Sequence, residues 1–72
     1  MKSIDARRLL CPMPVIRLQD EIKNRPAQSQ IEIICTDPGV MSDIPSWCKV
    51  HGHRVISAEE KDGEYRLVID VM

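Results

Sequence analysis

The spacing of apolar residues alternates between strand and helix periods along the chain, and this alternation restricts the fold more than any other feature. Val15, Leu18 and Ile22 recur at i, i+3 and i+7, which predicts an amphipathic helix that Pro26 ends. The β-branched run at 30–36 predicts a buried strand. The expected elements are strands at 2–6, 30–36, 54–60 and 64–72, and helices from about Val15 to the residue before Pro26 and at about 42–51.

The second helix is bounded by residues that favour helix ends. Ser42 or Asp43 can cap its start, Pro45 suits a first turn, and Gly52 suits its end. Because proline disrupts a helix interior, we expect this helix to begin late, at about residue 42. Its expected core-facing residues are Ile44, Trp47 and Cys48.

The order of elements predicts the architecture. A strand, a helix and a strand in succession favour a parallel pair with a right-handed crossover. Lys61-Asp62-Gly63 predicts a tight turn, so the last two strands form an antiparallel hairpin. Two helices cannot cover both faces of a four-stranded sheet. We therefore expect an α+β two-layer sandwich, β-α-β-α-β-β, with a four-stranded mixed sheet and both helices on one face. The residues expected on one face of the last strand are Tyr65, Leu67, Ile69 and Val71.

Size and composition exclude several classes of protein. The 72 residues and 8.2 kDa allow one domain, residues 1–72, and 43% apolar with 29% charged residues exclude a disordered tail. No apolar run reaches the roughly 18 to 20 residues of a membrane span, and the N-terminus lacks a signal-peptide stretch, so we expect a cytoplasmic protein without membrane insertion. With no Phe, one Trp and one Tyr, stacking surfaces for nucleic acid are scarce, and no direct nucleic-acid partner is expected.

Charge is distributed unevenly along the chain. Residues 1–25 carry a net charge of +3 and residues 26–72 a net charge of −4. The asymmetry either steers a charged partner toward the basic half or is a property of a solvated surface without a role.

Cys11-Pro12-Met13-Pro14 is the strongest candidate site, because it lies between an expected strand and the helix that follows. A thiolate at a helix N-terminus is stabilised by the helix dipole, which lowers the pKa of the thiol below about 8.5. Both prolines suit a first helical turn, and they restrict the loop so that the thiol is exposed rather than packed in a core. Arg7 and Arg8 could strengthen the effect by folding back, and Met13 is either the helix cap or an exposed apolar contact for partners.

Hydrolysis and dithiol exchange fit this cysteine poorly. His51 and His53 should lie at the far end of the second helix, away from the helix N-termini, which disfavours a Cys–His hydrolase. Met13 and Pro14 stand where a dithiol motif would have its second cysteine. A thiolate that accepts a group and passes it on needs little beyond access to its partner.

The remaining cysteines are interpreted as small core residues. Cys35 ends an apolar run, and Cys48 lies on the inner face of the second helix, although a Cys35–Cys48 pair or a resolving role toward Cys11 stays open. Cys48, His51 and His53 have loose ligand spacing without a Cys-x-x-Cys set, so we expect no metal and no cofactor.

Several short motifs occur in register along most of the chain. They are Ile4-Asp5-Ala6, Leu9, Cys11-Pro12-x-Pro14, Asp37-Pro38, Asp43-Ile44-Pro45-x-Trp47-Cys48 and Gly52-His53. Together they resemble the TusA/SirA/YedF-like sulfur carrier family, of which Cys-Pro-x-Pro is the most specific element, and the expected fold agrees with the two-layer fold of that family. Two positions depart from the family pattern: Arg8 stands where glycine is usual, and Thr36 where a second acid is frequent.

The resemblance implies that Cys11 accepts sulfane sulfur as a persulfide from a donor protein, such as a cysteine desulfurase or a rhodanese. The sulfur then passes to an acceptor protein of a sulfur relay by transient contact. Such relays serve tRNA thiolation, molybdenum-cofactor maturation or sulfur oxidation, and some relatives act with a membrane thiosulfate transporter. The protein would be a sulfurtransferase-type carrier rather than a stand-alone turnover enzyme.

Two other functions remain as alternatives. One is a regulatory or protein-binding module that acts through the basic half of the chain and in which the cysteine is not catalytic. The other is an RNA-binding domain, which the balanced charge and the few aromatic residues disfavour. Because a carrier exposes its loop to several partners in turn, it needs no permanent dimer, and a monomer is expected.

Overall fold

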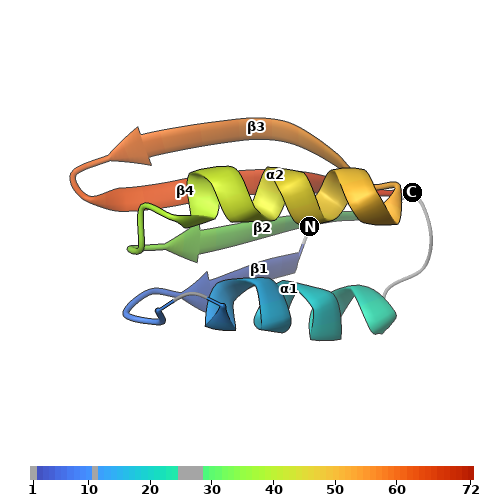
Figure 1. Cartoon of the computed structure of the whole chain (residues 1–72), viewed down its shortest axis with the longest axis horizontal. Helices are drawn as coiled ribbons and strands as arrows, with labels where there is room; N and C mark the ends of the chain where they lie inside the picture. Colours follow the sequence, from blue (N-terminus) through green and yellow to red (C-terminus); the bar gives the residue numbers. More distant parts are fainter. Residues whose placement is uncertain (1, 11, 25–28) are drawn as a thin grey trace.

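The computed structural model describes residues 2–10, 12–24 and 29–72, and its elements follow the order predicted from the apolar spacing (Figure 1). They are β1 (Lys2–Ala6), α1 (Met13–Lys23), β2 (Ser29–Cys35), α2 (Val40–His51), β3 (Arg54–Lys61) and β4 (Glu64–Val71). The predicted order β-α-β-α-β-β is confirmed. Pro26, predicted to end the first helix, lies outside the described residues, and α1 ends at Lys23 with Asn24 as its C-cap.

The four strands form one mixed sheet in the order β1-β2-β4-β3. β1 and β2 are parallel, with Ala6 opposite Cys35, and β4 is antiparallel to both of its neighbours. Parallel strands end at the same edge, so the loops that follow β1 and β2 lie together. The β3–β4 turn lies at the same end of the molecule, at the left in Figure 1. Three segments that are distant in sequence therefore meet there.

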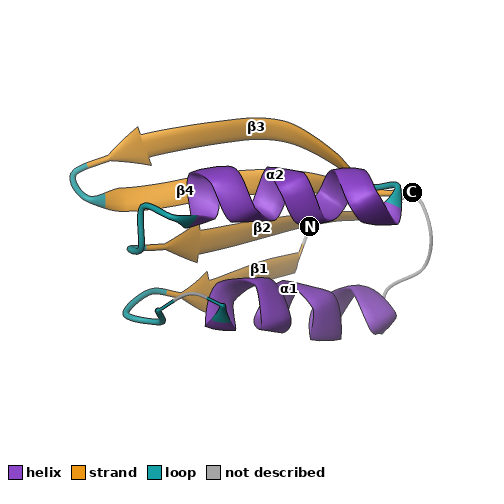
Figure 2. Cartoon of the chain, in the orientation of Figure 1, coloured by secondary structure: helices purple, strands orange, loops and turns teal. Residues whose placement is uncertain are grey.

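Both helices cover the same face of the sheet (Figure 2). α1 packs against β1 and α2, whereas α2 packs against β3 and β4. Pro14 and Leu18 are the buried residues of α1, and a fully buried leucine contributes roughly 2 to 3 kcal/mol of hydrophobic stabilisation, so Leu18 anchors this helix. The buried apolar core consists of Ala6, Leu18, Ile31, Ile33, Cys35, Val40, Ile44, Cys48, Leu67, Ile69 and Val71. The predicted α+β two-layer sandwich is confirmed.

α1 begins at Met13, two residues before the periodic pattern that predicted it. Pro12 is the N-cap and Pro14 the second helical residue, a position where proline loses no helical hydrogen bond. The Ile16 N–H donates to the carbonyl of Pro12 at 3.1 Å. Met13 is therefore the first helical residue rather than the cap. Pro14 is buried, although the sequence pattern indicated only that it restricts the loop.

The start of α2 differs from the prediction. The helix begins at Val40 with Gly39 as its N-cap and without a side-chain cap hydrogen bond, so the predicted capping by Ser42 or Asp43 is wrong. Pro45 consequently lies inside the helix rather than in its first turn. Because proline has no N–H, the helix forgoes one backbone hydrogen bond there.

The turn before α2 explains its early start. An Asp37 Oδ1 atom accepts the N–H of Gly39 at 3.0 Å, and the Asp37 carbonyl accepts the N–H of Val40 at 3.2 Å. The N–H of Met41 donates to the carbonyl of Pro38 at 3.2 Å. This turn satisfies the first N–H groups of the helix from outside, so no side-chain cap is needed at residue 42 or 43.

The β3–β4 hairpin closes as predicted. Asp62 and Gly63 have φ angles of 53° and 81°. A two-residue type I′ hairpin turn requires positive φ at both of its central residues. On β4, Leu67, Ile69 and Val71 are buried toward the helices and Tyr65 is half-buried, as the alternation predicted.

Candidate functional site

Cys11, the residue expected to carry the chemistry, lies outside the described residues, so its neighbours in the chain define the site. A turn follows β1, in which the N–H of Leu9 donates to the carbonyl of Ala6 at 3.4 Å. At the start of α1, the N–H of Met13 donates to the carbonyl of Leu10 at 2.9 Å. Hydrogen-bonded turns therefore bound the loop on both sides of Cys11.

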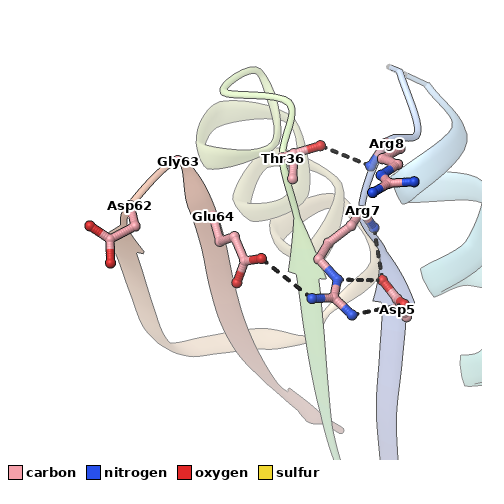
Figure 3. A pocket seen from close by; sticks show the side chains of 7 residues that line it. All are labelled: Asp5, Arg7, Arg8, Thr36, Asp62, Gly63 and Glu64. Carbon is pink, nitrogen blue, oxygen red and sulfur yellow. Dashed lines mark hydrogen bonds and ion pairs between the residues drawn. The ribbon is translucent and has the colours of Figure 1, made fainter.

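Arg8 has an unusual backbone conformation in the first of these turns. Its φ of 67° is left-handed, which costs a residue other than glycine about 1 to 2 kcal/mol. Its N–H donates to Oγ1 of Thr36 at 2.8 Å, and Thr36 directly follows β2 (Figure 3). The two positions that depart from the family pattern are thus in direct contact.

The Arg7 guanidinium lies between two carboxylates (Figure 3). Its Nε and Nη2 atoms donate to Oδ1 and Oδ2 of Asp5 at 2.9 and 3.1 Å, and Nη1 donates to Oε2 of Glu64 at 3.4 Å. The side-chain bonds from Arg7 to Asp5, followed by one from the Arg7 backbone N–H, lower the pKa of Asp5 to about 2. Arg7 thereby links the end of β1 to the start of β4. Its predicted approach to Cys11 involves a residue outside the described ones and stays a prediction.

The N-terminus of α1 lies next to the loop. Pro12 caps the helix, the first turn has no acidic side chain, and no side-chain cap hydrogen bond is made there. The partial positive charge of this helix end is therefore not neutralised by its own first turn. Since Cys11 directly precedes Pro12, an anionic sulfur on it would lie near this charge.

Apolar side chains are exposed on both sides of Cys11. Leu10 is 75% exposed, and Met13 and Ile16 are each 40% exposed. Met13 and Ile16 are one turn apart on α1, and we call these three residues the Leu10 patch. Exposed apolar side chains grouped in this way are typical of protein contact surfaces. Met13 is partly exposed, and its role as a contact for partners stays a prediction.

An open cavity of about 500 Å³ lies beside the turn that follows β1 (Figure 3). It is lined by Asp5, Arg7, Arg8, Thr36, Asp62, Gly63 and Glu64. Sites for small molecules are usually enclosed and mostly apolar, whereas this cavity is open and lined by charged groups.

Cys35 and Cys48 are core residues, as predicted. Both are free thiols with 0% and 1% of their surface exposed. Burial raises the pKa of each thiol to about 11, and Asp37 adds to the effect at Cys35. A thiol in this state is a weak nucleophile near neutral pH, because almost none of it is thiolate.

The two histidines lie at the end of the molecule opposite the N-terminus of α1, where α2 ends (Figure 1). The Trp47 ring stacks on His51 and His53, with ring centroids 4.3 and 5.7 Å apart. The Nδ1 atom of His51 is 3.0 Å from the carbonyl of Trp47, and Nδ1 of His53 accepts the N–H of Met72 at 3.2 Å. These contacts stabilise the end of α2 and the start of β3.

Sequence reasoning did not find the partners of the arginines. Asp5 stands two residues before Arg7, so a local ion pair could have been proposed from spacing alone. Glu64 and Thr36 reach Arg7 and Arg8 only through the pairing of the strands. Their participation carries no signal in the local sequence.

The described part of the chain has neither a cluster of metal ligands nor a helix that could span a membrane. No three His, Cys, Asp or Glu side chains within residues 2–10, 12–24 and 29–72 form a group that could hold a metal ion. Neither of the two helices in these ranges has the length and apolar character needed to cross a membrane.

Comparison with known proteins gives consistent results. The family described as "Sulfurtransferase TusA" matches residues 2–71. The "Sulfur carrier protein TusA" of Pseudomonas syringae pv. syringae (strain B728a) is 34% identical over 63 residues, which cover 88% of this chain and 75% of that protein. The protein of the same name from Pseudomonas putida (strain W619) is 37% identical over 62 residues, which cover 86% and 78%.

A solved structure of another protein has the same fold. The SirA-like protein from Desulfitobacterium hafniense superposes with a TM-score of 0.87 at 22% sequence identity, over 97% of this chain and 96% of that one. The family match extends over nearly the whole chain and includes Cys11-Pro12-Met13-Pro14. The chain belongs to the sulfurtransferase TusA family.

Proposed function

We propose that this protein carries sulfane sulfur as a persulfide on Cys11 and passes it to an acceptor protein. In the loading step, the Cys11 thiolate attacks the outer sulfur of a persulfide on the donor. A new S–S bond forms on Cys11, the S–S bond of the donor breaks, and the donor leaves as a thiolate. In the unloading step, a thiolate of the acceptor attacks the outer sulfur on Cys11, which leaves as a thiolate. Neither step needs an external oxidant or reductant.

One observation carries the proposal. Cys11 directly precedes Pro12, the N-cap of a helix whose first turn has no acidic side chain. A helix N-terminus stabilises negative charge, and it would favour both the attacking thiolate and the persulfide anion that results. Membership of a family of sulfur carriers supports the same role.

The partners are other proteins of a sulfur relay. A cysteine desulfurase or a rhodanese is the proposed donor, and the Leu10 patch would contact donor and acceptor in turn. Because a carrier must leave both partners, we expect weak and transient complexes of a monomer rather than a permanent assembly. Since a relay between thiols needs a reducing compartment, we place it in the cytoplasm.

Intact-protein mass spectrometry tests the proposal. The protein is incubated with a cysteine desulfurase and cysteine, and separately with a rhodanese and thiosulfate. We expect the gain of one sulfur atom, reversed by reductant and absent in Cys11→Ser. Cys48→Ala is the matched control and should load like the unmodified protein. The donor that loads the protein then separates tRNA thiolation and cofactor maturation from sulfur oxidation or use with a thiosulfate transporter.

Other outcomes would contradict the proposal. An adduct that persists in Cys11→Ser would place the chemistry on Cys35 or Cys48. No adduct from either donor, together with full function of Cys11→Ser in cells, would instead indicate a regulatory or protein-binding module.

A further inference from the structure

We propose that Thr36 is a positioning residue for Cys11, because its hydroxyl holds Arg8 in the left-handed conformation from which the loop to Cys11 begins. The effect on sulfur transfer rests on the proposed function of Cys11. The effect on the loop does not, since it concerns the backbone of residues that the structure describes.

The contact itself is short and connects two distant parts of the chain. The N–H of Arg8 donates to Oγ1 of Thr36 at 2.8 Å across 28 residues of sequence. Arg8 has a φ of 67°, and its side chain is exposed, so no core packing holds it in this conformation. Glycine adopts positive φ readily, whereas other residues need a compensating interaction. The Thr36 hydroxyl provides that interaction.

Thr36 is itself held in place. It directly follows Cys35, which is fully buried and pairs with Ala6 across the β1–β2 ladder. Its β-branched side chain restricts χ1, so the hydroxyl has few alternative directions. Thr36 follows the end of β2, and β2 pairs with β1, the strand that precedes Arg8. This pairing fixes the position of the hydroxyl oxygen relative to Arg8.

Hydrogen bonds hold the residues on both sides of Arg8 in this turn. On one side, Arg7 is fixed by its bonds to Asp5 and Glu64; on the other, the N–H of Leu9 donates to the carbonyl of Ala6. Only Arg8 has a conformation that is unfavourable on its own. If its partner is removed, the turn can relax at this residue, three positions before Cys11, and we expect the rates of the Cys11 reactions to change with it.

Removing the acceptor tests the proposal. Thr36→Val keeps the shape of the side chain and removes the oxygen, whereas Thr36→Ser keeps the oxygen and is the matched control. We expect Thr36→Val to slow both sulfur loading and iodoacetamide alkylation of Cys11 by roughly three- to tenfold, the range for loss of one uncharged hydrogen bond. The pH profile of alkylation should shift to higher pH, which a purely structural role would not cause. Thr36→Ser should react like the unmodified protein.

An Arg8→Gly background separates positioning from general damage. Glycine needs no partner at positive φ, so adding Thr36→Val to an Arg8→Gly protein should change both rates by less than about twofold relative to Arg8→Gly alone, because the loss of the Arg8 charge is common to both variants. The proposal is overturned if Thr36→Val reacts at the original rate with an unchanged pH profile, or if Thr36→Val slows the Arg8→Gly protein as much as it slows the unmodified one.

Amide hydrogen exchange gives an answer that needs no variant. The Arg8 amide belongs to an exposed residue outside the strands, and we expect it to exchange well below the rate of an unstructured chain because Thr36 accepts its proton. Exchange at the unstructured rate would overturn the proposal, even if Thr36→Val does not fold. If no donor loads Cys11 but the alkylation and exchange results appear as expected, the positioning role stands and the proposed function alone fails.

Discussion

At the scale of single residues, the burial of Cys35 and Cys48 bears on which thiol of the chain can react. Cys35 and Cys48 are buried thiols whose pKa values are raised to about 11. At pH 7 only about one in ten thousand such thiols is a thiolate. A sulfur donor that meets this protein therefore encounters no competing nucleophile from Cys35 or Cys48.

The raised pKa of Cys48 predicts a loss of stability in alkali. The thiol ionises near pH 9 in the unfolded chain but near pH 11 in the folded protein, so unfolding releases a proton between these values. The stabilisation is complete below pH 9 and decreases as the pH rises toward 11. The expected loss is roughly 1 kcal/mol for this thiol at pH 10.

Urea denaturation at pH 8 and pH 10 measures this effect. Between the two pH values, the unmodified protein should lose about 1 kcal/mol more unfolding free energy than Cys48→Ala. The cavity left by Cys48→Ala lowers stability at both pH values, so it cancels in the comparison. Equal losses in the two proteins would show that the Cys48 thiol is not protected from ionisation.

At the scale of elements, α2 has a glycine at each end, and the two glycines meet different requirements. Gly39, the N-cap, has a helical φ of −59° that any residue can adopt. Gly52, the C-cap, has a φ of 80°, and the N–H of His53 beyond it donates to the carbonyl of Cys48 at 2.8 Å. The backbone conformation therefore requires glycine at position 52 but not at position 39.

Alanine at these two positions should therefore have different effects. Gly52→Ala should lower the unfolding free energy by about 1 kcal/mol because of backbone strain alone, since no atom lies within 4 Å of the added Cβ. Gly39→Ala is the matched control. Its Cβ would lie 3.4 Å from Oδ1 of Asp37, an ordinary contact, so its stability should be unchanged or slightly higher.

Thermal denaturation distinguishes these outcomes. A difference of about 1 kcal/mol corresponds to roughly 4 to 8 °C in Tm for a domain of this size. If Gly52→Ala melted at the same temperature as Gly39→Ala, the left-handed cap would not contribute to the stability of α2.

The elements also show what local sequence can and cannot predict. Apolar spacing, together with the proline, glycine and turn residues between the segments, predicted the type and order of all six elements. The start of α2 was predicted wrongly, because the rule against proline in a helix was applied without the hydrogen bonds that Asp37 provides. At the candidate site, local sequence indicated Cys11 and the helix that follows it. The Thr36–Arg8 contact could not be predicted, since it depends on strand pairing.

At the scale of the whole molecule, the two ends differ in character. One end brings together the turn that follows β1, the Leu10 patch and the open polar cavity. The opposite end, where α2 ends (Figure 1), has the stacked rings of Trp47, His51 and His53, which are held by contacts within the chain. Since Leu10 and Met13 flank Cys11 in the sequence, we expect a donor to contact the Leu10 patch and not the far end of α2.

This arrangement predicts that a polar substitution in the patch impairs docking and leaves the chemistry intact. Ile16→Gln removes an exposed apolar contact without adding a charge near the helix dipole. It should lower kcat/KM for loading from a donor by roughly five- to tenfold, mainly through KM. Alkylation of Cys11 by iodoacetamide needs no docking and should change by less than about twofold.

Val50→Gln is the matched control, because Val50 is 80% exposed on α2 near the opposite end. It makes the same kind of chemical change on a helix surface, and loading should continue at the original rate. Equal losses in the two variants would mean that the donor does not select this end of the molecule. Slower alkylation in Ile16→Gln would instead mean that the substitution disturbs the loop, because a small reagent reaches the thiol without contacting the patch.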